Sequence, residues 1–493
     1  MGLPATAASS LDYSRIPLAR LAWPLLVENI LRISLMSVDT LMLGRFSPEA
    51  VAAMSVATQL AFFIQLLYGM VSVGSSVLIT QNLGAGRRRE ASRCGVASLV
   101  LILVLSLVVS ALMVVGAGPT IDLYGLDPQV ARYARQFLTV YCGLSFFMAV
   151  NVGQSSILRS WGHVRDPMLV NVFCLLLTVG GNALCLFGPF GLPVLGVTGV
   201  AVSTVASQAV ACGLAAWMIR RRGLELPFRV ALRLPGRLYR SILVLGILTA
   251  GENMSWCLSQ IAILAMLSGM GTVALTTYGT LMAVLRYIFM PGSSIGAATQ
   301  ILVGYLVGSR RYGEASHRVY RYFATGFVIS LVLVLALQVF HRSILGLFSR
   351  DPQVVALAAS ALLVAVVHEP GRNLNTIVIP ALKGAGDVRF AVSVGVASMW
   401  GLGVAGAWLL GVRLGLGLVG VWVAMAAEEW IRGIAMLLRW RAGAWQRMAL
   451  VSHDSAAADS PATTVGLSRS AEPHRVRGTS CGAAAPAGPT DTT

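Results

Sequence analysis

The sequence has few charged residues, and this shortage indicates the solvent in which the chain folds. Only 12% of its 493 residues are charged, whereas 56% are hydrophobic and the mean hydropathy is +0.76. A water-soluble domain usually carries about 25% charged residues, so this chain could not cover its surface in water. It is predicted to be an all-α integral membrane protein that contacts the lipid bilayer.

Paired cysteines and histidine clusters are also missing. The seven cysteines are scattered, without the spacing of a disulfide framework or a metal site. His163, His317, His341 and His368 stand singly on different segments, so the convergent groups of an intramembrane enzyme are not found. We therefore expect no enzymatic activity, no cofactor and no metal cluster.

Acidic residues are scarce relative to basic ones, which gives a net charge of +17. The excess lies in the loops of one side: 24 Lys and Arg fall on the side of the N-terminus and six on the opposite side. This distribution favours membrane topology over nucleic-acid binding, and it places both termini and the loop 220–240 in the cytoplasm. The loop lies at the level of anionic lipid headgroups.

The chain has one lysine and is rich in arginine, alanine and glycine, which is typical of a GC-rich bacterial genome. The expected location is therefore the inner (plasma) membrane, crossed many times by a protein expected to act as a monomer. The first dozen residues are polar and run into a segment too long and too Arg-flanked for a cleavable signal peptide.

An internal duplication is what the sequence does contain. Shifted by 224 residues, the two halves align without a gap: Glu28-Asn29 falls on Glu252-Asn253, Asp127-Pro128 on Asp351-Pro352, and Leu158-Arg159 on Leu382-Lys383. A membrane helix needs about 20 apolar residues, and six such segments occur in each copy. They lie at 17–43, 51–83, 94–115, 133–158, 167–187 and 196–219, then at 241–267, 275–307, 318–339, 357–382, 391–411 and 418–440.

These segments predict twelve transmembrane helices as two parallel six-helix repeats, because an even number of spans returns the chain to the same side. The predicted parts are a cytoplasmic N-terminal segment (1–16), an N-lobe (17–219), a basic cytoplasmic linker (220–240), a C-lobe (241–440) and a disordered cytoplasmic tail (441–493).

Charges within the predicted spans are candidate functional groups, since each costs at least about 2.5–3.5 kcal/mol at the bilayer centre. The acids are Glu28, Asp39, Glu252, Glu369, Glu428 and Glu429, and the bases are Arg32, Arg286, Arg372 and Arg432. Spacings of three or four residues predict Glu28–Arg32, Glu369–Arg372 and Glu428–Arg432 pairs. Two carboxylates remain, and an unneutralised buried carboxylate is suited to bind H⁺ or a cation such as Na⁺.

Depth separates these residues into two groups. Glu252, Arg286, Glu369, Arg372, Glu428 and Glu429 fall near the middle of their spans, where transporter sites commonly lie. Arg286 is expected to neutralise one of these glutamates. Asp39 falls in the outer third of the first span at a depth similar to that of Asn182, which is expected to donate to Asp39 or share a cation with it.

The repeat serves as an internal control on these candidates. Glu28 and Glu252 occur in both copies, so packing and proton or substrate handling remain alternatives for them. Asp39 has Ile263 as its counterpart, and a coupling-ion site is weighed there against a structural cap. For Glu369 and Arg372 the alternative is a buried pair that satisfies itself.

Motifs distributed along both copies resemble the multidrug and toxic compound extrusion (MATE) family. The first span reads Trp23-Pro24 through Glu28-Asn29 to Val38-Asp39-Thr40, similar to the family's opening pattern. The other motifs are Gly84-Ala85-Gly86 with its basic run and Glu90-Ala91, Leu158-Arg159, Leu382-Lys383 with Gly386-Asp387, and Glu369-Pro370-Gly371-Arg372. The resemblance covers about 15–445.

The resemblance implies a V-shaped, two-lobed bundle that exports organic, often cationic and amphipathic, compounds in exchange for H⁺ or Na⁺. It implies that Asp39 is the protonation or cation site of the N-lobe, with Asn182 beside it. Leu186 stands where relatives similar to DinF carry a second acid. By the same resemblance, the C-lobe acid of NorM-type members aligns near Cys257, and Glu252 is the residue expected to substitute for it.

Other classes remain as alternatives. A lipid-linked saccharide flippase of the same superfamily would carry extra helices and a cationic cleft. A major-facilitator carrier would carry Asp-Arg-x-Gly after its second span, and Gly86-Arg87-Arg88-Arg89 lacks the Asp. A channel would show a repeated pore loop or a ring of charges, and neither is found in this sequence.

Overall fold

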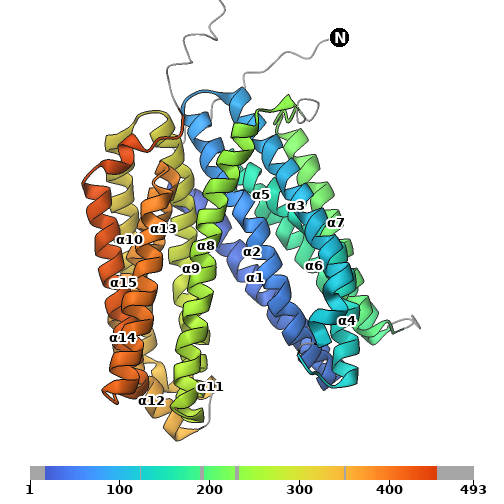
Figure 1. Ribbon diagram of the computed structural model, residues 1–493, viewed down its shortest axis with the longest axis vertical. Helices are drawn as coiled ribbons and strands as arrows, with labels where there is room; N and C mark the ends of the chain where they lie inside the picture. Colours follow the sequence, from blue (N-terminus) through green and yellow to red (C-terminus); the bar gives the residue numbers. More distant parts are fainter. Residues whose placement is uncertain (1–16, 123, 189–193, 228–232, 349–350, 452–493) are drawn as a thin grey trace, which may run out of the picture. The chain divides into compact units, whose positions relative to one another are not determined.

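The computed structural model describes residues 17–122, 124–188, 194–227, 233–348 and 351–451, apart from the side chains of Arg32, Leu35, Met36, Ser37, Leu347 and Phe348. Within these ranges the regular structure is helical (Figure 1). The first half contains α1 (Leu18–Phe46), α2 (Pro48–Gly84), α3 (Arg88–Asp122), α4 (Pro128–Gly143), α5 (Phe146–Ser160), α6 (Arg165–Phe187) and α7 (Gly196–Arg221).

The second half repeats this order with small changes. It contains α8 (Gly236–Gly269), α9 (Thr272–Gly308), α10 (Tyr312–Val339), the short α11 (His341–Phe348), α12 (Pro352–Ala385), α13 (Val388–Ser398), α14 (Ala405–Ala407) and α15 (Gly417–Arg441). Two π-helical stretches, Met399–Val404 and Trp408–Arg413, flank α14. The helices from α13 to Arg413 therefore form one span.

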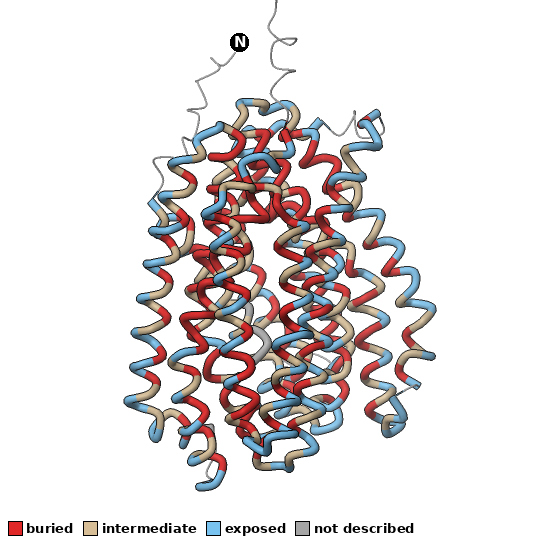
Figure 2. Tube along the Cα trace, turned by 60° about the vertical axis from the view of Figure 1, so that its left-hand side comes forward, coloured by how far each residue is buried: buried red, intermediate tan, exposed pale blue. Residues whose placement is uncertain are grey.

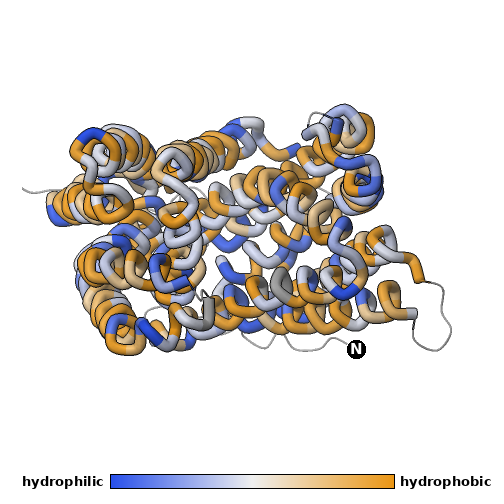
Figure 3. The backbone as a smooth tube through the Cα atoms, turned by 90° about the horizontal axis from the view of Figure 1, so that it is seen from below, coloured by the Kyte–Doolittle hydropathy of each residue, from blue (hydrophilic) through white to orange (hydrophobic). Residues whose placement is uncertain are grey.

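The predicted membrane crossings are confirmed, with boundaries that differ from the helix ends by up to seven residues. Among the described residues, nine helical segments are long and apolar enough to cross a membrane, and α4 with α5, bent by 48°, makes a tenth. The remaining two, α1 and α15, are 29 and 25 residues long, which is enough to cross. Most of the chain in these helices is hydrophobic, as the view along the bundle shows (Figure 3).

The duplication is visible in local geometry as well as in sequence. Asp127 and Asp351 each accept a hydrogen bond from the backbone N–H two residues on, at 3.0 and 2.8 Å, with proline in the first helical position. These are N-caps of a kind that Asp-Pro favours. Gly86 has φ +76°, and its counterpart Arg310, the one non-glycine residue with positive φ in the described ranges, has φ +59°. The same turn therefore follows α2 and α9.

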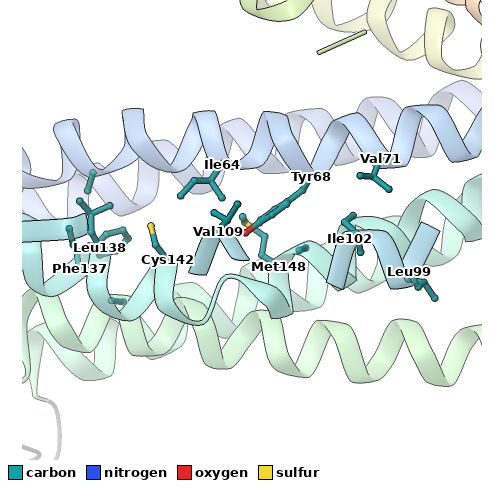
Figure 4. Packing of buried hydrophobic residues seen from close by; sticks show 14 of the residues in the cluster. Ile64, Tyr68, Val71, Leu99, Ile102, Val109, Phe137, Leu138, Cys142 and Met148 are labelled. Carbon is teal, nitrogen blue, oxygen red and sulfur yellow. The ribbon is translucent and has the colours of Figure 1, made fainter. Parts of the chain in front are cut away.

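Buried residues form one large core in the first half and two in the second, with two small clusters beside α7, and two of the large cores include a helix from the other half (Figure 2). In the first core, Tyr68 of α2 lies among aliphatic side chains of α3 and α5 (Figure 4). Ile242 and Leu245 of α8 belong to this core, whereas Leu21 and Leu25 of α1 belong to a core of the second half. The first helix of each repeat thus packs into both lobes.

The two lobes meet most closely where α2 and α9 end. A Cβ added at Gly84 would lie 2.0 Å from the carbonyl oxygen of Tyr305, and one added at Gly308 would lie 2.0 Å from that of Gln81. These two contacts are related by the 224-residue repeat. We call this end of the bundle, at the top of Figure 1, the basic end, because the arginine-rich turns after α2, α7 and α9 lie there.

The predicted tail and linker are shorter than expected. Residues 442–451 are folded, although the tail was predicted to begin at 441: Trp445 is buried and its ring stacks on Trp440 at 4.1 Å. Leu450 N–H also donates to Gln81 of α2 at 2.8 Å. The stacked and buried rings of Trp440 and Trp445 fix this segment against the end of α15. The composition of the sequence did not indicate this contact. Residues 1–16 and 452–493 lie outside the described residues. The linker is reduced because α7 continues to Arg221 and α8 begins at Gly236.

Candidate functional site

Asp39 and Asn182 lie together between α1 and α6. Asn182 Nδ2 donates to Asp39 Oδ1 at 2.8 Å, so the structure brings together the two residues that the sequence placed at one depth. Asn182 is fully buried, and its Oδ1 has no hydrogen-bond partner among the described residues. Leu186, one turn further along α6, is buried and apolar. The second acid of similar sequences is therefore replaced by packing.

Glu28 is on α1 and contacts α6, as Asp39 does, but it lies nearer the basic end. Its Oε1 accepts from Asn171 Nδ2 of α6 at 2.9 Å and lies 3.2 Å from Arg159 Nη2 of α5. The predicted partner was Arg32, whose side chain lies outside the described residues, so that pair stays a prediction. Arg159 was missed because it follows Glu28 by 131 residues and no local spacing links them.

Glu252 occupies the equivalent position in the second lobe and is paired in the same way. Its Oε2 lies 2.5 Å from Lys383 Nζ, and both side chains are about nine-tenths buried. Lys383 is in the last turn of α12. Glu252 is the 17th of the 34 residues of α8, near the middle of the helix, and the long Lys383 side chain extends to it from near the basic end. The proposed coupling site does not include Glu252, since Lys383 already neutralises its charge.

Glu369 and Arg372 form the predicted pair in the middle of α12. Arg372 Nη1 donates to Glu369 Oε1 at 3.3 Å, and the guanidinium lies 4.2 Å from the ring centre of Phe289. The buried His368 adds a contact of 3.1 Å from Nδ1 to the same carboxylate oxygen. The sequence did not indicate His368, because a single histidine on an apolar helix gives no pattern.

A small cavity of about 10 Å³ lies beside this pair, close to the smallest that holds one water molecule. Asn373 lines it, and neither side-chain atom of Asn373 has a hydrogen-bond partner among the described residues. Ser330 of α10 and Glu369 also line it. An unsatisfied amide that lines one cavity with a carboxylate and a hydroxyl is suited to bind a water molecule.

Glu428 and Glu429 share one base on α15. Arg432 Nε lies 3.2 Å from Glu428 Oε1, as the spacing predicted, and Nη2 lies 2.7 Å from Glu429 Oε2. Ser398 donates to Glu428 at 2.7 Å, and Asn375 of α12 donates to Glu429 at 2.7 Å. Ser398 directly precedes the first π-helical stretch, a kind of local irregularity often found at functional sites.

Arg286 does not neutralise any of these glutamates. It is exposed, and the ion pairs of the described residues connect the glutamates instead to Lys383, Arg372 and Arg432. A helix presents residues on all its faces, and Arg286 lies on an outer face of α9 that the sequence could not orient.

Counting charges with Arg159 and Lys383 included changes the balance. Every glutamate of the set contacts a base, whereas no ion pair joins Asp39 to a base in the described part of the chain. Asp39 is therefore the acid whose charge the fold compensates least.

The fold and these sites define a multi-span membrane protein built from two fused six-helix repeats. The MatE family model matches residues 24–184 and again 249–409, which follows the duplication. The chain belongs to this family, the multidrug and toxic compound extrusion transporters.

Similar proteins cover almost the whole membrane part. An uncharacterized transporter YisQ of Bacillus subtilis is 35% identical over 430 residues, which are 86% of this chain and 94% of that protein. A probable multidrug resistance protein NorM of Thermotoga maritima is 26% identical over 446 residues, covering 89% and 95%.

Solved structures confirm the fold. A MATE protein in its bent conformation superposes with a TM-score of 0.83 at 19% identity, covering 90% of this chain and 99% of that one. The Vibrio cholerae MATE transporter VcmN superposes with a TM-score of 0.81 at 15% identity, covering 88% and 97%.

Proposed function

We propose that this transporter exports organic, cationic or amphipathic compounds from the bacterial cytoplasm through the plasma membrane in exchange for H⁺. The observation that supports this most is Asp39: a carboxylate within a membrane helix, bonded to Asn182, that no ion pair neutralises among the described residues. Such a group binds and releases a proton more readily than one held by a fixed base.

The basic end faces the cytoplasm in this proposal. Arginine is concentrated there, and the positive-inside rule retains such loops in the cytoplasm. Both termini then lie in the cytoplasm, and Asp39, 21 residues into α1, lies toward the outside. Each chain contains the whole site, so it acts as a monomer.

Two states are enough for exchange. When Asp39 takes a proton from the outside, its negative charge is lost and a cationic substrate is held less tightly. When the proton leaves to the cytoplasm, the charge returns and a new substrate binds. The proton and the substrate therefore compete for the negative charge of Asp39. The proton gradient then drives export of the substrate, as reciprocal coupling between the two binding events requires.

The experiment measures the transport of dye into inside-out vesicles, which corresponds to export from the cell. The proton and sodium gradients are imposed separately. We expect a proton gradient to drive the efflux of cationic dyes, and Asp39→Asn, which cannot be protonated, to reduce it by about 100-fold or more. Insertion of the variant is checked by its amount in the membrane. Efflux driven by sodium alone, or unchanged proton-driven efflux in the variant, would reject H⁺ coupling at Asp39.

A further inference from the structure

The same acid–amide contact occurs twice between α1 and α6. Asn182 donates to Asp39 at 2.8 Å, and Asn171 donates to Glu28 at 2.9 Å. Both helices begin at the basic end, and on each helix the two residues are 11 positions apart. That spacing is three turns, or about 16 Å along the axis. One seam between two helices therefore holds an outer and an inner carboxylate.

One oxygen of the inner carboxylate has no hydrogen-bond partner in the described part of the chain. Asn171 and Arg159 both contact Oε1 of Glu28, and Oε2 is buried without a hydrogen-bond partner among the described residues. A buried carboxylate oxygen without a donor is costly and uncommon. It is free to accept a proton or a water molecule.

The surroundings of Glu28 allow a proton to leave again. Arg159 lies in the last turn of α5 and its side chain is 29% exposed, so the pair reaches the basic end. The guanidinium therefore lies between the carboxylate and the water of that end, next to the place where a released proton would leave. The other charged pair near the start of α6, Asp166 with Arg222, is closed on itself by two hydrogen bonds of 2.7 Å.

Buried hydroxyl side chains of α6 and α7 lie beside the seam, at heights along α6 between its two amides. Thr178 is buried on α6 between Asn171 and Asn182, and Ser203 Oγ of α7 donates to the Thr178 carbonyl at 3.3 Å. Ser207 follows one turn later on α7 and is also buried. Hydroxyl groups of this kind support water molecules that carry a proton over a distance no direct contact spans.

The second copy lacks this seam. Ile263 and Gly406 stand at the positions of Asp39 and Asn182, and Gly395 stands at that of Asn171. A Cβ added at Gly395 would lie 3.6 Å from Glu252 Oε1, so the geometry is kept while the amide is absent. Glu252 and Lys383 thus form an ion pair without an amide donor. Glu28 contacts both a base, Arg159, and an amide donor, Asn171.

We propose that Glu28 is the inner proton-relay residue of the first lobe. A proton leaves the Asp39 carboxyl group through water, binds Oε2 of Glu28, and passes to cytoplasmic water beside Arg159. Asp39 and then Glu28 return to the carboxylate form, and no other bond changes. This proposal depends on H⁺ coupling at Asp39, which is the proposed function.

The test compares Glu28→Gln with its repeat-related control Glu252→Gln in proteoliposomes that contain a trapped pH-sensitive dye. Two rates are measured with a cationic dye as substrate: net antiport driven by a proton gradient, and exchange of dye for dye, which needs no net proton release. Their ratio is insensitive to the amount of folded protein, because misfolding lowers both rates.

We expect Glu28→Gln to lower this ratio about tenfold or more, Glu28→Asp to retain it, and Glu252→Gln to leave it unchanged. A normal ratio in Glu28→Gln, or equal losses in Glu28→Gln and Glu252→Gln, would overturn the relay. If Asp39→Asn is inactive while Glu28→Gln is normal, the relay alone fails. If Asp39→Asn retains proton-driven antiport, the proposed function fails first and the relay with it.

Discussion

At the scale of residues, the glutamates within the membrane are neutralised mostly by residues distant in sequence. Glu28 contacts Arg159, and Glu252 contacts Lys383. Both bases lie in the last turn of a helix, where their long side chains extend inward along apolar surface. The single lysine of the chain is thus used at a buried ion pair.

Replacing Lys383 leaves Glu252 buried without a counter-charge. We expect Lys383→Met to lower the free energy of unfolding by about 3–5 kcal/mol, and the double variant Glu252→Gln with Lys383→Met to recover most of this loss. Thermal unfolding in detergent measures both, with the exposed Arg286→Met as a control expected to change stability by less than about 0.5 kcal/mol. Equal stability of Lys383→Met and the wild type would show that the pair contributes nothing.

At the scale of elements, packing changes helices that the sequence predicts as alike. The fourth span is bent by 48° between α4 and α5, whereas its counterpart α12 is continuous despite Pro370 and Pro380. The predicted eleventh span contains two π-helical stretches around α14. In both lobes the irregular helix lies beside polar groups: Ser145 at the bend accepts or donates a 2.7 Å hydrogen bond with Tyr68, and Ser398 bonds to Glu428.

The backbones of α2 and α9 approach each other closely where the two helices cross at Gly84. A Cβ at Gly84 meets the backbone of Tyr305, which cannot move as a side chain would. We expect Gly84→Ala to destabilise the protein by about 1–3 kcal/mol. Gly69→Ala, in the same helix but with nothing within 4 Å of the added Cβ, is expected to be neutral or stabilising by up to about 1 kcal/mol. Unfolding curves of the two variants that coincide would contradict the close approach.

At the scale of the whole molecule, the two repeats are interlocked by their first helices. Residues of α1 lie in a core of the second half, and residues of α8 lie in the core of the first. Asn29 of α1 also donates to Ser294 of α9 at 3.2 Å. Movement of one lobe against the other therefore carries α1, and with it both Asp39 and Glu28.

Membrane orientation is tested by labelling single cysteines in a background without the native cysteines. Arg310 lies at the basic end and Arg132 in α4 at the opposite end. With an impermeant maleimide added to intact cells, we expect Arg132→Cys to be labelled and Arg310→Cys to be labelled only after the cells are opened, because arginine-rich loops stay inside. The reverse pattern would invert the proposed direction of transport.

The sequence by itself determined the number of helices, their duplication and the neighbours Asp39 and Asn182, because hydropathy, a fixed 224-residue shift and equal depth in two spans are all read along one dimension. The i,i+3 and i,i+4 pairs of α12 and α15 followed from helical spacing for the same reason. Tertiary structure decided which base meets Glu28 and Glu252, where Arg286 points, and that residues 442–451 fold against Gln81. These contacts depend on the tilt and rotation of helices, which packing sets and no local pattern records.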